Sequence, residues 1–211
     1  MRRSLGALAC AGLLAACAGM QPQQVEKQDF YLLEARPATA LPGPGTDLVI
    51  EVGMPRARAG YDTDRMAYTR RPGEIEYFSR NRWADAPARM LAPAIAQAIE
   101  HSGAFRAVVL APSTVPVDLR LDTELVRLQQ SFSAHPSRLE MTVRVQLVTT
   151  IPARALASAQ FDEVEDAPSD DPYGGVTAAN RALSRLVERI ADFCAAQAAQ
   201  AQDCTGGVRC H

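Results

Sequence analysis

Residues 139–147 alternate strictly between apolar and polar side chains. One face of this segment would carry Leu139, Met141, Val143, Val145 and Leu147, and the other would carry Glu140, Thr142, Arg144 and Gln146. A period of two predicts a half-buried antiparallel strand over 139–150, with one face on a core and the other in water. Residues 117–132 alternate in the same way until Val126 and Leu128 change the phase. This change predicts a second long strand with a β-bulge.

Shorter apolar runs bounded by polar or turn residues predict further strands. They cover residues 29–33, 48–52, 64–68, 74–78, 105–110 and 157–161. Proline and glycine make 36–47 a loop and 70–73 a turn. Residues 162–171 carry six carboxylates, whose spacing does not fit an EF-hand calcium loop. We interpret this stretch as a solvated acidic loop.

Two segments have helical periodicity. Asp85 as N-cap and Pro87 in the first turn would open one helix, and Gly103 would end it. Pro93 should kink this helix or delay its start. The apolar stripes of the two helices consist of Leu91, Ile95, Ala98 and Ile99, and of Ala179, Leu183, Leu186, Val187, Ile190 and Phe193. One stripe on each helix predicts that both cover the same side of the sheet. The expected fold is an α+β two-layer sandwich over 29–202, with a mixed, mostly antiparallel sheet.

The first sixteen residues have the parts of a secretory signal peptide. Arg2 and Arg3 give a basic start, and an apolar run of about 12 residues follows, ending in small residues. This run is shorter than the roughly 20 apolar residues of a membrane-spanning helix. Leu14-Ala15-Ala16-Cys17 resembles the bacterial lipobox, in which the cysteine is lipidated and cleavage makes it the new N-terminus. The alternative is an ordinary signal peptide with a chance cysteine.

The predicted lipid on Cys17 has consequences for location. Cys10 has too short an apolar run before it to be the lipidated residue. Ala18, and not aspartate, follows Cys17, so the sorting rule of enteric bacteria predicts transfer to the outer membrane. Residues 17–28 are polar and aperiodic, and we interpret them as the lipidated N-terminus and a flexible tether. We therefore expect a domain that is lipid-anchored at the periplasmic face of the outer membrane.

Charge and cysteine content indicate neither nucleic-acid binding nor a metal site. Loss of Arg2 and Arg3 would leave 20 of the 22 basic residues against 24 acidic ones, which gives no argument for nucleic acid. Cys194, Cys204, Cys210 and His211 could be a zinc shell, but their spacings are irregular. We expect no metal or cofactor, a buried Cys194 and a candidate Cys204–Cys210 disulfide in a tail over 203–211. Pairs that include Cys194 stay open.

No catalytic constellation is recognisable, so we expect a protein that is not an enzyme. His101, His135 and His211 have no partner that the sequence can place beside them, and nucleotide-binding and hydrolase motifs are absent. Amphipathic side chains of the kind found at partner surfaces are instead the contact candidates. They are Tyr31, Tyr68, Tyr77, Trp83 and Arg82. Trp83 is also interpretable as a core anchor. The arginines around it, at positions 65, 70, 71, 80, 82 and 89, could meet lipid phosphates, an acidic partner or only solvent.

An ordered set of motifs resembles one known family. After the lipobox come Phe-Tyr-Leu-Leu (30–33), Leu-Val-Ile-Glu-Val (48–52), Tyr-Asp-Thr-Asp-Arg-Met-Ala-Tyr (61–68), Glu-Ile-Glu-Tyr (74–77), Arg-Trp-Ala-Asp-Ala-Pro (82–87), Gly-Ala-Phe (103–105) and Ala178-Ala179. Together they resemble the ABC-type transport auxiliary lipoproteins, which include the paraquat-inducible PqiC lipoproteins. Pro93 and the cysteine-containing tail depart from that pattern.

The resemblance implies a non-enzymatic partner of an MCE-domain protein and of an ABC transporter permease and ATPase. Such a system moves lipids or other hydrophobic molecules between the two membranes, and the lipoprotein would dock it at the outer membrane. A homo-oligomer and a directly bound lipid stay open. An apolar groove between sheet and helices would favour lipid carriage, and a filled core would favour docking alone. The alternatives are an assembly lipoprotein, pilotin-like or lipopolysaccharide-assembly-like, that binds an outer-membrane barrel or secretin, and a periplasmic enzyme.

Overall fold

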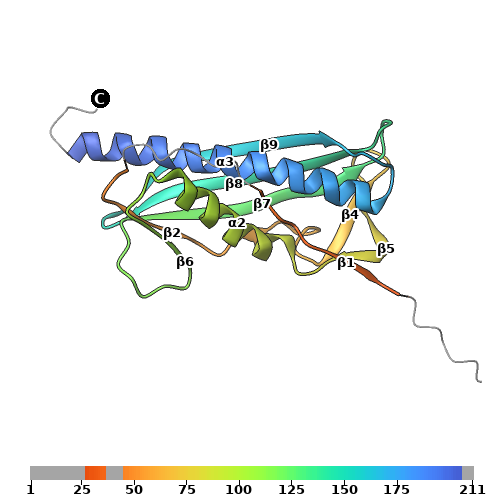
Figure 1. Ribbon diagram of the computed structural model, residues 1–211, viewed down its shortest axis with the longest axis horizontal. Coiled ribbons are helices and arrows are strands. Elements are labelled where there is room, and N and C mark those ends of the chain that lie inside the picture. Colours follow the sequence, from red (N-terminus) through yellow and green to blue (C-terminus); the bar gives the residue numbers. More distant parts are fainter. Residues whose placement is uncertain (1–26, 37–44, 206–211) are drawn as a thin grey trace, which may run out of the picture.

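A three-stranded antiparallel meander forms the long part of the sheet (Figure 1). In the computed structural model, which describes residues 27–36 and 45–205 (side chains to 202), these strands are β7 (Leu119–Ser131), β8 (Arg138–Thr150) and β9 (Ala153–Asp166). The β7–β8 register shifts between Leu125 and Arg127, which confirms the predicted bulge. The five apolar residues of β8 that were predicted to face the core are all buried.

Short strands extend the sheet from the other edge of β7. They are β1 (Asp29–Tyr31), β2 (Val49–Val52), β3 (Arg56–Ala57), β4 (Arg65–Thr69), β5 (Glu76–Trp83) and β6 (Ala107–Leu110). β2, β3 and β4 pair in parallel with the start, middle and end of β7. β6 continues outward from β2, whereas β5 and then β1 continue outward from β4. The sheet therefore divides into two arms at opposite ends of β7.

Two helices cover one face of this sheet (Figure 1). Helix α3 (Pro172–Thr205) packs along β8 and β9, and α2 (Pro87–Ser102) packs against α3 and against the β2–β6 arm. Leu91, Ile95 and Ile99 of α2 are fully buried between the layers, as are Leu183 and Ile190 of α3. These apolar stripes confirm the two-layer α+β architecture, because each helix buries one side on the same face of the sheet.

The start of α2 differs from the prediction. The N-cap residue is Ala86, not Asp85, and its side chain makes no capping bond. The chain stays extended as far as Trp83, because β5 pairs with β1 there in register Tyr31↔Trp83. The Asp85 carboxylate instead accepts hydrogen bonds from Arg89 and from the backbone N–H of Ala86. The helix runs continuously across Pro93.

The acidic stretch is not a solvated loop over its first half. β9 continues to Asp166, and the Glu163 side chain is only 9 % exposed. Arg185 Nε lies 3.0 Å and Arg189 Nη1 2.7 Å from the Glu163 carboxylate oxygens. Buried carboxylates require such partners. The prediction was wrong because the pairing arginines lie on α3, far along the chain.

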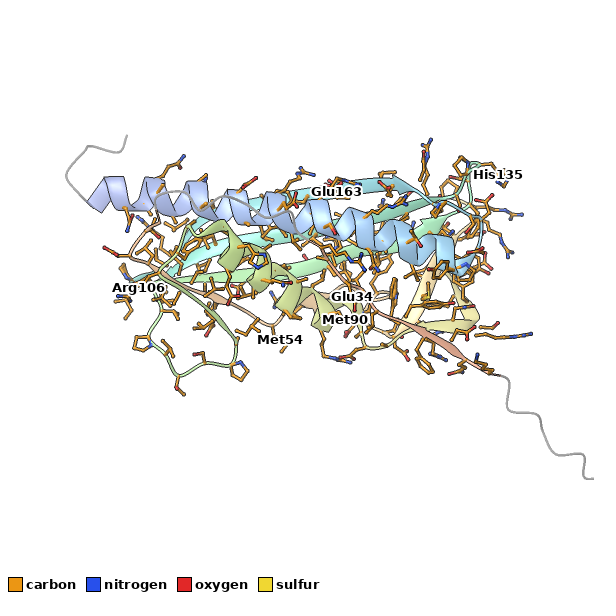
Figure 2. All side chains as sticks on the ribbon, in the orientation of Figure 1. Glu34, Met54, Met90, Arg106, His135 and Glu163 are labelled. Atoms are coloured by element: carbon orange, nitrogen blue, oxygen red, sulfur yellow. The ribbon has the colours of Figure 1, made fainter. Side chains whose placement is uncertain are left out.

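The molecule is elongated and has two distinct ends (Figure 1). The tether end holds the start of β1, the β4–β5 and β7–β8 turns and the start of α3. The far end holds the 111–118 loop, the β8–β9 turn and the last turns of α3. Figure 2 shows His135 at the tether end and Arg106 at the far end. The 34 residues of α3 span about 50 Å at 1.5 Å per residue.

Candidate contact surfaces

The predicted contact residues lie together in the β1–β5–β4 arm. Trp83 is only 3 % exposed and packs in the core beneath the helices, where it supports the core interpretation. Tyr31, Tyr68 and Tyr77 are partly exposed. The arm therefore brings these side chains into one region of the sheet, while it places Trp83 inside the protein and the tyrosine rings at its surface.

The tyrosines of this arm already have partners within the chain. The Tyr68 hydroxyl donates to Glu76 Oε2 at 2.8 Å, and this bond, followed by burial, raises the pKa of Tyr68. The Tyr77 hydroxyl donates to the Gly60 carbonyl at 2.8 Å, and the Arg65 guanidinium lies 4.0 Å from its ring centre. These contacts hold the rings in place and leave only their outer faces for a partner.

Carboxylates lie against four of the arginines around Trp83. Arg82 Nη1 lies 3.1 Å from Asp64 Oδ1. The other pairs are Arg70 with Glu76, Arg71 with Glu74, and Arg89 with Asp85. A surface on which positive charges alternate with negative ones offers no strong field to lipid phosphates. The geometry therefore does not favour the phosphate-binding interpretation of this arginine group.

Hydrogen bonds fix the tip of the tether end. Asp170 accepts the Ser137 backbone N–H at 2.6 Å and lies 2.8 Å from His135 Nδ1. These bonds, the Ser137 bond first, lower the pKa of Asp170 to about 2. Gln130 Nε2 donates to Ser137 Oγ at 2.8 Å and joins the same network from β7. Asp170 thus connects the β7–β8 turn to the segment that leads into α3.

The interior offers no space for a lipid near Trp83. The cavity there, between β4, β7, β8 and α3, is about 10 Å³. A larger pocket of about 510 Å³ opens beside β7, where Tyr61, Gln129, Arg127 and Glu140 form a polar chain. The Tyr61 hydroxyl donates to Gln129 at 2.6 Å, and Gln129 and Arg127 both donate to Glu140. This pocket is polar, and the cavity near Trp83 is too small for a lipid.

The far end has a different surface. Three of its exposed side chains are large and apolar: Leu110 is 45 %, Val115 50 % and Ile151 92 % exposed. A pocket of about 420 Å³ there is lined by residues that include Arg106, Pro116 and Ile151. Exposed apolar side chains gathered at one end are typical of an interaction site. The sequence predicted the strand over 105–110 but gave no sign that it would lie at the sheet edge, because edge position depends on strand order.

Cys194 is the one residue of the predicted zinc shell and disulfide pairs whose side chain the structure describes. Its thiol is fully buried in α3, and this burial raises its pKa to about 12. Among the described residues, no group of three or more histidine, cysteine, aspartate or glutamate side chains is placed to hold a metal ion. The side chains of Cys204, Cys210 and His211 lie outside the described residues, as do Cys17 and the predicted signal peptide, so these predictions stay open. Within the described part of the chain, no helix is long and apolar enough to span a membrane.

Known proteins provide an independent comparison. The crystal structure of protein XCC0632 from Xanthomonas campestris is 21 % identical, with a TM-score of 0.76 over 83 % of this chain and 99 % of that one. The crystal structure of an uncharacterized protein, 12 % identical, has a TM-score of 0.63 over 80 % of this chain and 99 % of that one. These similarities show the fold. The comparison with curated proteins gave no match.

A family model identifies the chain more directly. The model for the ABC-type transport auxiliary lipoprotein component matches residues 31–191. This range runs from β1 through most of α3 and includes both arms of the sheet. The chain belongs to this family, and the resemblance seen in its ordered motifs is confirmed.

Proposed function

We propose that this auxiliary lipoprotein is anchored by lipidated Cys17 at the periplasmic face of the outer membrane, where it docks an MCE-domain assembly. That assembly, with its ABC permease and ATPase, would move lipids or other hydrophobic molecules between the two membranes. The observation that carries the proposal is the family match over residues 31–191. The protein's contribution is position and binding, not catalysis.

The shape of the domain supports a docking role. The described chain enters at the tether end, and the far end lies about 50 Å away along α3. A domain attached to the membrane at its tether end can present its far end to a partner in the periplasm. The filled space near Trp83 supports docking without carriage of a lipid beneath the helices.

Co-purification tests the docking role. The tagged full-length protein is solubilised from cells that also express an MCE-domain protein, and the bound proteins are identified by mass spectrometry. We expect the MCE protein in the eluate. Its repeated absence would contradict the proposal, and an outer-membrane barrel or secretin in its place would favour an assembly lipoprotein.

The anchor has its own test with a matched control. Cys17→Ser should abolish incorporation of radiolabelled palmitate and release the protein from the outer-membrane fraction. Cys10→Ser, which changes a cysteine inside the predicted signal peptide, should leave both unchanged. A lipidated Cys17→Ser protein would exclude Cys17 as the attachment residue. A lipidated wild type in the inner-membrane fraction would overturn the predicted location.

A further inference from the structure

The outward face of β1 is apolar, unlike the outward face of the long strand β8. Phe30 in β1 is 60 % exposed, and Leu32, directly after β1, is 55 % exposed. The residues that alternate with them lie inward, since Tyr31 is partly buried and Leu33 is buried. The outward positions of β8 carry polar and charged side chains, as is usual for a sheet face in water. Apolar residues at the outward positions of a strand indicate a contact with something other than water.

Contacts on the inner side fix the direction of this pair. The Tyr31 ring centre lies 6.4 Å from that of Tyr173 on α3, and Asn81 Nδ2 donates to the Tyr31 hydroxyl at 3.1 Å. All three residues of β1 pair with β5. Successive side chains of a strand point to opposite sides. Phe30 and Leu32 are therefore held outward by the same pairing that holds Tyr31 inward.

The predicted lipid attachment point is close to this pair along the chain. Phe30 comes 13 residues after Cys17, and that length of chain spans at most about 45 Å when fully extended. The described chain enters the domain at this end, and the far end with Ile151 lies about 50 Å away along α3 (Figure 1). Among the described residues, Phe30 and Leu32 are thus the exposed large apolar side chains that follow Cys17 most closely.

A lipid surface fits this pair better than a protein does. A stable protein interface buries about 800 Å² per partner, and two side chains are far too small for that. Insertion at a membrane surface uses a few apolar side chains such as phenylalanine and leucine beside polar ones. The neighbouring charges are paired, Lys27 with Asp29 at 3.7 Å and Arg82, the register partner of Phe30, with Asp64 at 3.1 Å. The attraction is therefore apolar and does not require anionic lipids.

We propose that Phe30 and Leu32 insert into the periplasmic surface of the outer membrane beside the lipid on Cys17. The acyl chains of the anchor hold the protein on the membrane without this contact. They do not set the orientation of the domain, because a single attachment point permits rotation. Once the anchor is in place the second contact is intramolecular, so a weak insertion is enough. It holds the tether end against the membrane and directs the far end away from it. This inference rests on the proposed lipid anchor.

Photo-crosslinking to lipid tests the contact. The lipidated full-length protein carries p-benzoylphenylalanine at position 30 or 151 and is reconstituted in phosphatidylcholine vesicles that contain a radiolabelled phospholipid. We expect a lipid adduct at position 30 and none at position 151, although Ile151 is the more exposed of the two side chains. Addition of phosphatidylglycerol to the vesicles should leave the yield at position 30 unchanged. An adduct that forms only with phosphatidylglycerol would contradict the apolar basis of the contact.

Leu32→Asp, with the probe at position 30, supplies a matched comparison. A carboxylate stays in water where a leucine enters lipid, so the adduct should fall to the level seen at position 151. Circular dichroism and the amount of protein on the vesicles should stay as in the wild type. Val164→Asp changes a side chain of similar exposure, 58 %, on β9 and should leave the adduct unchanged. Any other pattern in the two variants would contradict insertion of Leu32.

The outcomes separate this inference from the proposed function. If the wild type carries no lipid on Cys17, both are overturned. If it is lipidated and bound to the vesicles but gives no lipid adduct at position 30, only the insertion is overturned. Equal lipid adducts at positions 30 and 151 would contradict a fixed orientation. An adduct at position 30 with a second copy of the chain, in place of lipid, would make this face a protein contact and would also overturn the inference.

Discussion

The two ends of the molecule differ in the contacts that their exposed side chains make within the chain. At the tether end, Arg70, Arg71 and His135 each lie against a carboxylate. At the far end, Leu110, Val115 and Ile151 are exposed, and Ile151 is almost wholly in solvent, while the tether end exposes Phe30 and Tyr173 beside its ion pairs. The same sheet and the same helix α3 connect both ends. Exposed apolar side chains therefore occur at both ends of the domain, and Ile151 is the most exposed of them.

This difference teaches which features stabilise the fold and which are free for binding. Polar groups satisfied within the chain contribute to their own local structure and have little left for a partner. Apolar side chains held in water gain free energy only when something covers them. The ion-paired side chains of the tether end are satisfied within the chain, whereas Ile151 at the far end and Phe30 near the start of β1 are left in water.

The largest expected effect is on the free energy of unfolding, and it distinguishes a core residue from an exposed one. Trp83→Ala should lower the free energy of unfolding by about 3–5 kcal/mol, because it removes a large buried side chain. Ile151→Ala at the far end should change it by no more than about 0.5 kcal/mol, because the side chain is exposed. Urea unfolding followed by circular dichroism measures both. A Trp83→Ala protein of wild-type stability that had lost its partner would make Trp83 a contact residue.

A smaller effect concerns how the stability of the tether end depends on pH. The pKa of Asp170 is lowered from 3.8 to about 2, first by the Ser137 backbone N–H and then by His135. A lowered pKa in the folded state adds stability above pH 4, and that stability is lost as the pH falls from about 4 to about 2. Asp170→Asn should therefore lower the melting temperature at pH 7, and its difference from the wild type should shrink over that range. A difference that is constant with pH would show that the charge of Asp170 is not the cause.

Much of the architecture follows from local patterns. The alternation over 139–147 predicts which face of β8 is buried, because every second residue of a strand points to the same side. The phase change near Leu125 predicts the bulge in β7 for the same reason. The stripes that contain Leu91 and Leu183 predict that both helices cover one face. In each case the information lies within a few neighbouring residues.

The predictions fail where the outcome depends on residues far apart in the chain. Glu163 is buried because Arg185 and Arg189 approach it from α3. Asp85 does not cap α2, since pairing with β1 keeps Trp83 in an extended strand. The exposed far end is missed for the same reason, because the edge position of β6 follows from strand order. Neither the secondary-structure propensity of the residues nor their hydrophobic periodicity specifies the order of strands in the sheet.

The central claim is that the far end, and not the tether end, binds the partner. Its most direct test compares capture of the MCE protein by two full-length double variants. Val115→Asp with Ile151→Asp places charges on exposed far-end residues, and Phe30→Asp with Leu32→Asp does the same near the tether. With equal folding and membrane attachment, the far-end variant should lose the MCE protein and the tether-end variant should retain it. Loss of capture only in the tether-end variant would contradict the account.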